Sequence, residues 1–202
     1  MIRILQVRNI DSFVESRRQK TSEKDRKTVQ SILNDVKRNG DSAVKKYERK
    51  FNGRKTSQLR VSEKEIKEAR SKISREEVTA LRDMSARLLP RQKILANPWL
   101  EAGSVYRDFV PIPSVGCYIP GGQARYPSSV VMSVVPARKA GVKRIVVVSP
   151  PGRDGKIDPL TIVAAKMCGA TEIYKVGGAQ AIAALAYGTK SIPKVDKIVG
   201  PG

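Results

Sequence analysis

Residues 115–202 alternate between short apolar runs and segments with helical patterning, which limits the folds that the chain can adopt. Glycine or proline follows each of four apolar runs: PGGQARYP follows VGCYI, PPGRDGKI follows RIVVVS, GGAQ follows EIYKV, and GPG follows DKIV. Apolar strands separated by helices are typical of a parallel sheet covered on both faces, with right-handed crossovers. The pattern predicts an α/β unit with strands near 115–119, 144–149, 172–176 and 195–199.

Capping residues mark the ends of the three helices between these strands. The first is expected to begin at Ser128 or Ser129, whose hydroxyl can accept from a free backbone N–H, and to run to Ala140. Asp158-Pro159 opens the second, with a capping carboxylate and a proline at the first helical position. The closing glycines are Gly141, Gly169 and Gly188.

The first half of the chain is charged and is predicted to be helical. Apolar residues recur at spacings of three and four between Val29 and Phe51, and Asn39-Gly40-Asp41 separates this pattern into two helices. Ser62-x-x-Glu65 and Ser74-x-x-Glu77 are capping boxes that open two further helices. The last of these helices is expected to end before Pro98.

A change of patterning near residues 111–114 predicts a domain boundary. The stretch WLEAGSVYRDFVPIP has the β-branched, proline-containing composition of extended chain. We therefore expect a helical region with an extended linker over residues 1–113, and an α/β domain over residues 114–202.

The composition excludes several kinds of protein. No apolar run approaches the roughly 18 residues of a membrane span, and the N-terminus has no signal-peptide core. The chain has no histidine, the commonest proton shuttle and metal ligand, so its own chemistry must use Lys, Asp, Glu, Tyr or Cys. Cys117 and Cys168 lie outside any C-x-x-C and are expected to be buried thiols of a reduced, cytoplasmic protein.

The net charge of +20 comes from 39 basic and 19 acidic residues and is spread over both halves. Residues 112–202 hold 12 basic and 4 acidic residues, which leaves 39 − 12 = 27 and 19 − 4 = 15 for residues 1–111. The densest run, RRQKTSEKDRK, contains no aromatic residue. A nucleic-acid site favours a localised basic stripe with aromatics, so a solvated helical face is the preferred interpretation of this run.

The four predicted strands all end in glycine or proline, which indicates a ligand site at one edge of the sheet. Ligands of open parallel sheets bind outside the carboxyl ends of the strands, where glycine allows close approach and helix N-termini favour anions. The alternative is that each Gly-Gly only makes a tight turn. No G-x-G-x-x-G is present, so the usual dinucleotide-binding fingerprint is absent.

Two side chains at this edge are candidate ligand contacts. Tyr118 lies at the end of the first strand, where its ring could stack on a flat ligand; the alternative is a core tyrosine. Gln180 lies in the first turn of the helix after VGG and can both donate and accept; the alternative is a surface glutamine.

The blocks VGCYIPGGQARYPSSVVMSVVPARKAGV and VGGAQAIAALAYGTKSIPKVDKIVGPG closely resemble the histidinol dehydrogenase family, and VQSILNDVKRNGDSAVKKYERKF resembles it more loosely. The resemblance implies an incomplete Rossmann-like domain after a helical region, in a cytoplasmic, zinc-dependent homodimer. It implies oxidation of L-histidinol through L-histidinaldehyde to L-histidine with two NAD. It further implies that Tyr118, Gln180 and an Asn following GPG contact NAD.

The resemblance also implies that the chemistry lies outside this chain. The family's zinc ligands (two His, a Gln and an Asp), its Glu-His acid/base pair and its substrate contacts are further along the sequence. On this interpretation the chain is the N-terminal part of a longer enzyme, holds no catalytic or metal residue, and is inactive alone.

Two other interpretations remain open from the sequence. The charge and the glycine edge also suit a self-contained basic module that binds a nucleotide or nucleic acid, for which steeply salt-dependent nucleic-acid binding without NAD binding would be the evidence. A non-catalytic assembly fragment is the third possibility.

Overall fold

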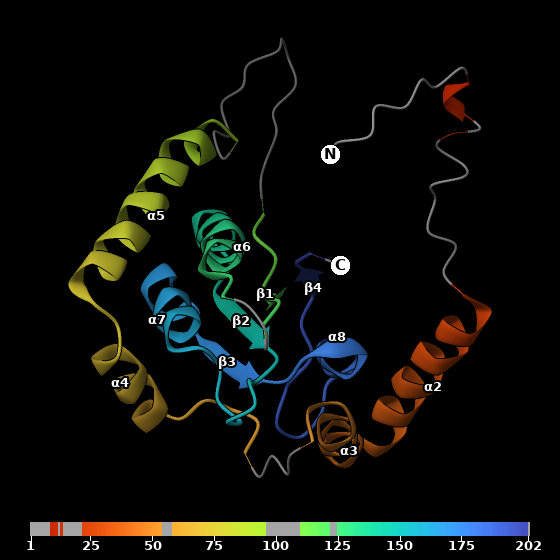
Figure 1. Ribbon diagram of the computed structural model, residues 1–202. Coiled ribbons are helices and arrows are strands. Elements are labelled where there is room, and N and C mark those ends of the chain that lie inside the picture. The colour runs from red at the N-terminus through yellow and green to blue at the C-terminus, as the bar shows by residue number, and fades with distance from the viewer. Residues whose placement is uncertain are drawn as a thin grey trace.

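The structure is a computed structural model that describes residues 9–11, 13, 22–53, 58–95, 110–121 and 125–201. The elements in chain order are α2 (Glu23–Asn39), α3 (Asp41–Asn52), α4 (Glu63–Ser71), α5 (Arg75–Leu95), β1 (Ser114–Tyr118), α6 (Pro127–Lys139), β2 (Arg144–Ser149), α7 (Pro159–Cys168), β3 (Glu172–Lys175), α8 (Gly178–Tyr187) and β4 (Lys197–Val199) (Figure 1).

The four strands form one parallel sheet in the order β3-β2-β1-β4, which confirms the α/β prediction. The strand bounds agree with the sequence pattern to within two residues. The largest difference is at β4, which begins at Lys197 rather than at Val195. The Val195 N–H donates to the Leu185 carbonyl of α8, so this residue is bound to a helix and not to the sheet.

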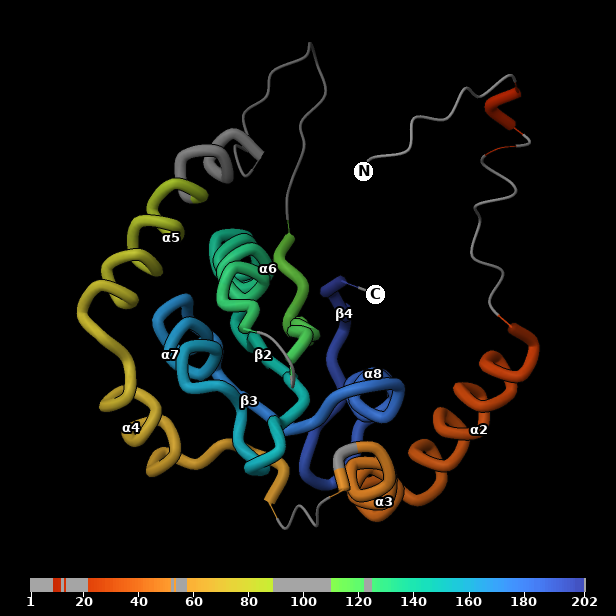
Figure 2. The backbone as a smooth tube through the Cα atoms, in the orientation of Figure 1, coloured from red at the N-terminus to blue at the C-terminus, as the bar shows by residue number. Residues whose placement is uncertain are grey.

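Helices cover both faces of the sheet and form two hydrophobic cores. Along β2, Ile145 and Val147 face one core, and Val146 and Val148 face the other. The first core is closed by α4, α5, α6 and α7, and the second by α2, α3 and α8. In Figure 2, α4 and α5 lie outside α7 and α6 on one side of the molecule, and α3 lies beside α8 on the other.

The helices that precede the sheet in sequence share these two cores with it. Val36 of α2 and Val44 of α3 are fully buried in the second core, and Ala69 of α4 and Leu81 of α5 are buried in the first. Of the predicted extended linker over residues 99–113, residues 99–109 lie outside the described residues, and residues 110–113 belong to no helix or strand. The division into domains at residues 111–114 therefore stays a prediction.

Residues 59–61 cover the outer edge of β3, a feature that the sequence patterns did not predict. The Lys175 N–H donates to the Leu59 carbonyl at 2.7 Å, and the Val61 N–H donates to the Ile173 carbonyl at 2.8 Å. Unpaired strand edges invite association with other chains, and this short antiparallel pairing removes that opportunity at β3.

The predicted helix starts are confirmed at three positions. Ser62 and Glu65 form both bonds of a capping box at α4. Ser74 and Glu77 exchange the same two bonds at α5. The Asp158 carboxylate accepts from the N–H groups of residues 160 and 161 at the start of α7. The break at Gly40 separates α2 from α3 as expected.

The expectation that Ser128 or Ser129 caps α6 is wrong. The helix begins at Pro127, after Tyr126, and no side chain caps it. Proline has no N–H to satisfy and its φ is already helical, so the first turn starts one residue earlier and both serines lie within it.

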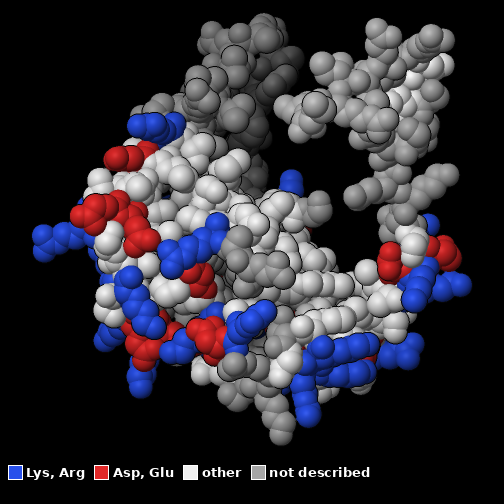
Figure 3. Space-filling model, viewed as in Figure 1, with Lys and Arg blue, Asp and Glu red and all other residues white. Residues whose placement is uncertain are grey.

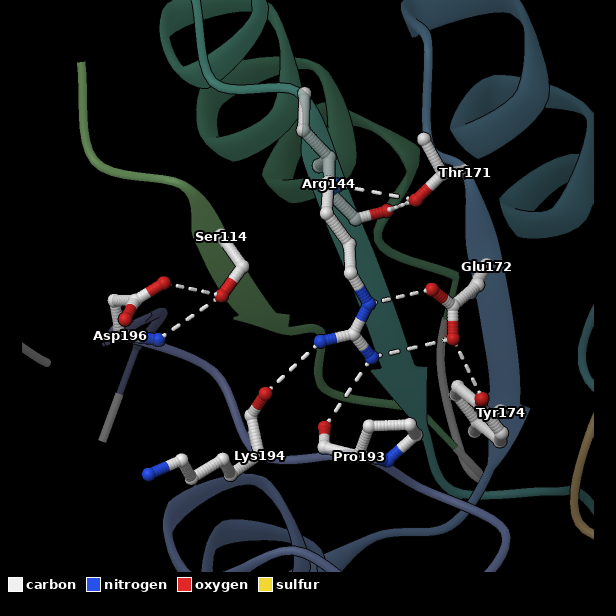
Figure 4. Close-up of polar contacts among 9 residues, drawn as sticks. Ser114, Arg144, Thr171, Glu172, Tyr174, Pro193, Lys194 and Asp196 are labelled. Atoms are coloured by element: carbon white, nitrogen blue, oxygen red, sulfur yellow. Dashed lines mark hydrogen bonds and ion pairs between the residues drawn. The ribbon is translucent and has the colours of Figure 1, made fainter.

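Arg144, at the start of β2, ties three segments together at the amino end of the sheet (Figure 4). Its guanidinium donates to both Glu172 carboxylate oxygens, at 2.7 and 3.3 Å, and to the carbonyls of Pro193 and Lys194, at 3.2 and 2.9 Å. Tyr174 donates a further bond to Glu172 at 2.7 Å. The planar fork of arginine suits such a bidentate pair, which holds β3 and the chain leading into β4 against β2.

We predict that Arg144→Ala lowers the free energy of unfolding by about 3 kcal/mol, because it leaves the Glu172 carboxylate half-buried without its cation. The two side chains are 26% and 14% exposed, so solvent screening of the pair is limited. Urea unfolding checks this, with Arg153→Ala as the control, since Arg153 is exposed and should change stability by no more than about 0.5 kcal/mol. Equal effects of the two variants would contradict the role of Arg144.

The same ion pair predicts a pH dependence. Burial opposes ionisation of Glu172, but hydrogen bonds from Arg144 and Tyr174 outweigh it, and the pKa of this carboxyl lies below its usual 4.5. A depressed pKa contributes stability above the unfolded-state pKa that is lost as the pH falls through the folded-state pKa. Wild type should therefore exceed Glu172→Gln in unfolding free energy at about pH 7, and the difference should shrink by about pH 3. A difference that is independent of pH would contradict this assignment.

Candidate functional site

The order of the strands creates a point of divergence between β1 and β4. From β1 the chain passes through α6 to β2, then through α7 to β3, and α8 returns it to β4 on the other side of β1. The first two crossover helices lie on one face and α8 lies on the other. In open parallel sheets the ligand crevice lies at such a switch point, outside the carboxyl ends of the strands.

A groove of about 340 Å³ lies at this point. The carboxyl ends of β1 and β4 and the first turns of α8 line it, and most of the lining is aliphatic or glycine. This confirms that the VGG and GPG turns meet at one edge. The lining residues are Tyr118, Gly178, Ile182, Ile198, Val199, Gly200 and Pro201.

Tyr118 lines this groove and is also partly buried against the second core. Its hydroxyl accepts a bond from the Gly178 N–H at 3.3 Å, which joins the end of β1 to the start of α8. The facing turn needs a glycine: a Cβ on Gly200 would lie 2.4 Å from the Tyr118 carbonyl oxygen, and the φ of Gly200 is +147°. Tyr118 is thus held between two glycine turns, with its backbone at Gly200 and its hydroxyl at Gly178, and it lines the groove.

Gln180 lies in the layer behind the groove and not on the surface. Its side chain is in the second core region at 1% exposure, so the alternative of a surface glutamine is wrong. The Gln180 Nε2 donates to the Glu48 carboxylate at 2.8 Å, while Oε1 is buried with no partner among the described residues. A Cβ on Gly178 would lie 2.9 Å from this oxygen, so the carboxamide sits directly behind the groove wall.

Glu48 is the residue near this site that the sequence patterns missed. It lies on α3, is fully buried, and accepts bonds from the Gly177 N–H at 3.0 Å and from Gln180. A signal was present, because position 48 is four residues after Val44 and so continues the buried stripe of the helix. A charged residue on such a stripe indicates a buried polar partner.

Both cysteines are buried and free, as expected. Burial raises the pKa of the Cys117 thiol to about 12 and that of the Cys168 thiol to about 11. The nucleophilic form is the thiolate, so these thiols are unsuited to covalent catalysis near neutral pH. Cys117 faces the first core, away from the groove that its neighbour Tyr118 lines.

Across the described residues, no group of three His, Cys, Asp or Glu side chains is placed to hold a metal ion. The side chains of this part of the chain therefore do not fit a zinc centre, which takes three or four nitrogen, sulfur or carboxylate ligands. Among the helices in the described ranges, none is long and apolar enough to cross a membrane.

Basic and acidic side chains are interspersed on the molecular face in Figure 3. Both kinds lie over α4 and α5, and a group of Lys and Arg lies near α3. On this face, the described residues form no continuous basic stripe of the kind that follows a nucleic-acid backbone. Residues 23–27 of the dense basic run are exposed on α2, as expected, and residues 17–21 lie outside the described part of the chain.

Comparison with known proteins points to one family. The family model described as histidinol dehydrogenase matches residues 15–202. A histidinol dehydrogenase of Bacillus licheniformis is 46% identical over 186 residues, which cover 90% of this chain and 44% of the relative. A histidinol dehydrogenase of Bacillus cereus is 48% identical over 184 residues, or 87% of this chain and 42% of the relative.

A crystal structure of histidinol dehydrogenase from Elizabethkingia anophelis matches with a TM-score of 0.83 and 33% identity, over 96% of this chain and 46% of that one. The chain thus spans less than half the length of the relatives it matches. These matches do not favour the alternative of a self-contained nucleic-acid-binding module. With the parallel sheet and its glycine-lined groove, they show that the chain belongs to the histidinol dehydrogenase family.

Proposed function

We propose that this chain contributes one wall of the NAD cleft to a histidinol dehydrogenase, which oxidises L-histidinol to L-histidinaldehyde and then to L-histidine with two NAD. The observation that supports this proposal most is the position of the groove at the switch point between β1 and β4, with Tyr118 at its rim. The family relation supplies the substrate and the cofactor of the proposal.

In this proposal Tyr118 and Gln180 are the cofactor contacts. Tyr118 lines the groove, and its ring can stack on a planar group. The Gln180 amide is fixed by Glu48 behind the groove, with one buried oxygen left over. NAD supplies a hydride acceptor when it is bound, and the protein's part is to hold and orient it.

Zinc, the acid/base pair and the contacts to L-histidinol are proposed to come from outside these 202 residues. The chain has no histidine, and its described carboxylates and thiols are not grouped as ligands. We further propose that the whole enzyme is a cytoplasmic homodimer. The two thiols buried in their reduced form are consistent with that compartment.

Tyr118→Ala and Gln180→Ala are each expected to weaken NAD binding about fivefold to tenfold, since a lost stacking contact or hydrogen bond costs on the order of 1 kcal/mol. The assay is NAD titration of a polypeptide extended to the length of the relatives, with zinc content measured on the same samples. Tyr187→Ala is the matched control, because Tyr187 is half-exposed on α8 and does not line the groove. The zinc content should stay unchanged in all three variants, and wild-type titrations for Tyr118→Ala and Gln180→Ala would show that both residues are structural.

The 202-residue chain alone is expected to bind no stoichiometric zinc and to produce no NADH with histidinol and NAD, because the metal ligands and the base are missing. The extended polypeptide should bind zinc and reduce NAD when histidinol is added. Metal analysis and NADH absorbance on both samples provide the test. Turnover by the 202-residue chain would contradict the proposed division of roles, and an inactive extended polypeptide would contradict the proposed activity.

A further inference from the structure

A protein carboxylate occupies the start of α8, where the sequence predicts an anion-binding turn. Glu48 is fully buried on α3, and its Oε1 accepts from the Gly177 N–H at 3.0 Å and from the Gln180 Nε2 at 2.8 Å. Gly177 is the N-cap of α8, and Gln180 lies in its first turn. One carboxylate oxygen therefore joins the glycine turn to the glutamine side chain.

This arrangement changes which ligand group suits the turn. A helix N-terminus binds phosphate through its free N–H groups and its dipole. At α8 the Gly177 N–H is already bound by Glu48, and the Gly178 N–H is bound by the Tyr118 hydroxyl at 3.3 Å. Two of the N–H groups that a pyrophosphate would use at the start of α8 are therefore already bound by protein acceptors, and one of these acceptors is the negatively charged Glu48 carboxylate.

The Glu48 carboxylate also fixes which atom of the Gln180 carboxamide is left without a hydrogen bond. A carboxylate oxygen that already accepts from Gly177 can only accept from the carboxamide, so Nε2 faces Glu48 and Oε1 faces away. That oxygen is buried without a partner among the described residues. A buried acceptor left without a donor is destabilising, and such atoms in native structures often mark a place where a further molecule binds.

The oxygen lies next to the groove. A Cβ on Gly178 would come within 2.9 Å of it, and Gly178 itself lines the groove beside Tyr118. The oxygen is buried and Gln180 does not itself line the groove, so a ligand bonds this oxygen only by entering beyond the Gly178 backbone. The group that reaches it must donate, as a hydroxyl or an amide N–H does and as a phosphate oxygen does not.

We propose that Glu48 is a positioning residue of the cleft, which holds Gln180 and the Gly177–Gly178 turn so that the α8 side receives an uncharged, hydrogen-bond-donating part of the dinucleotide instead of its pyrophosphate. This inference rests on the proposed function. It assigns no direct ligand contact to Glu48, whose carboxylate acts through Gly177 and Gln180.

A double-mutant cycle of NAD binding tests this proposal in the polypeptide extended to the relatives' length. Glu48→Ala should weaken NAD binding about fivefold to tenfold, and Glu48→Gln should stay within about twofold of wild type, because an amide oxygen can accept both bonds. In a Gln180→Ala background, Glu48→Ala should add less than about twofold, since the two residues act on one contact. Fully additive effects would overturn the proposal.

The sign of the Glu48→Ala effect separates the two placements of the dinucleotide. If the pyrophosphate bound at the start of α8, removal of Glu48 would free the Gly177 N–H and tighten the binding of NAD and of inorganic pyrophosphate. Tighter binding of either probe would therefore overturn the proposal. Glu48→Asp serves where Glu48→Ala does not fold: its shorter carboxylate cannot make both bonds, and it should weaken NAD binding by about the same factor.

An NMR readout on the 202-residue chain tests the geometry without NAD. The side-chain amide resonances of Gln180 should shift in Glu48→Asp or Glu48→Ala. They should stay near wild type in the control variant Glu65→Ala, since Glu65 binds Lys175 and not Gln180. Unmoved Gln180 resonances would overturn the proposal. If these resonances shift but the extended wild type does not bind NAD, the proposed function is what fails.

Discussion

The sheet must bury both of its faces, and the rest of the structure depends on this requirement. Consecutive residues of β2 are fully buried on opposite sides, so each face needs its own layer of helices. The crossover helices α6 and α7 cover one face with help from α4 and α5, while α8 covers the other face only together with α2 and α3. Burial therefore brings α3 against α8, and with it the Glu48 carboxylate against the glycine turn of the candidate cleft. The same packing of α3 against α8 thus completes the second core and places Glu48 at the candidate site.

The elements that sequence patterns predicted are those fixed by local chemistry. The four strands follow from runs of branched aliphatic residues, and the starts of α4, α5 and α7 follow from side chains that satisfy nearby N–H groups. The serines at α6 misled the prediction because two capping residues stood next to a proline that needs no cap. Features made by residues distant in sequence were not predicted: the pairing of 59–61 with β3, the clamp of Arg144 on the chain before β4, and the contact of Glu48 with Gly177.

In the candidate site, too, the features fixed by local sequence were predicted and those made by distant residues were not. That Tyr118 would lie at the edge carrying the glycine turns followed from the end of a predicted strand and from parallel pairing. The meeting of β1 with β4 depended on the return of α8 to the other side of β1, which no local pattern specifies. The sequence correctly predicted that Gln180 lies in the first turn of its helix. The burial of the Gln180 side chain was not predictable in this way, because it depends on α3, which lies more than a hundred residues earlier. The glycine at 200 then allows its turn to close against the Tyr118 backbone, while Gly178 donates its N–H to the Tyr118 hydroxyl.

In the proposed function, the dinucleotide lies at the carboxyl ends of β1 and β4, against Tyr118 and the first turn of α8. The most direct measurement is an electron-density map of the extended polypeptide crystallised with NAD. We expect density for a planar group over the Tyr118 ring and for a hydrogen-bond-donating, uncharged group near the Gly177–Gly178 turn. NAD density that is confined to another part of the molecule, with the groove between β1 and β4 left to solvent, would contradict it.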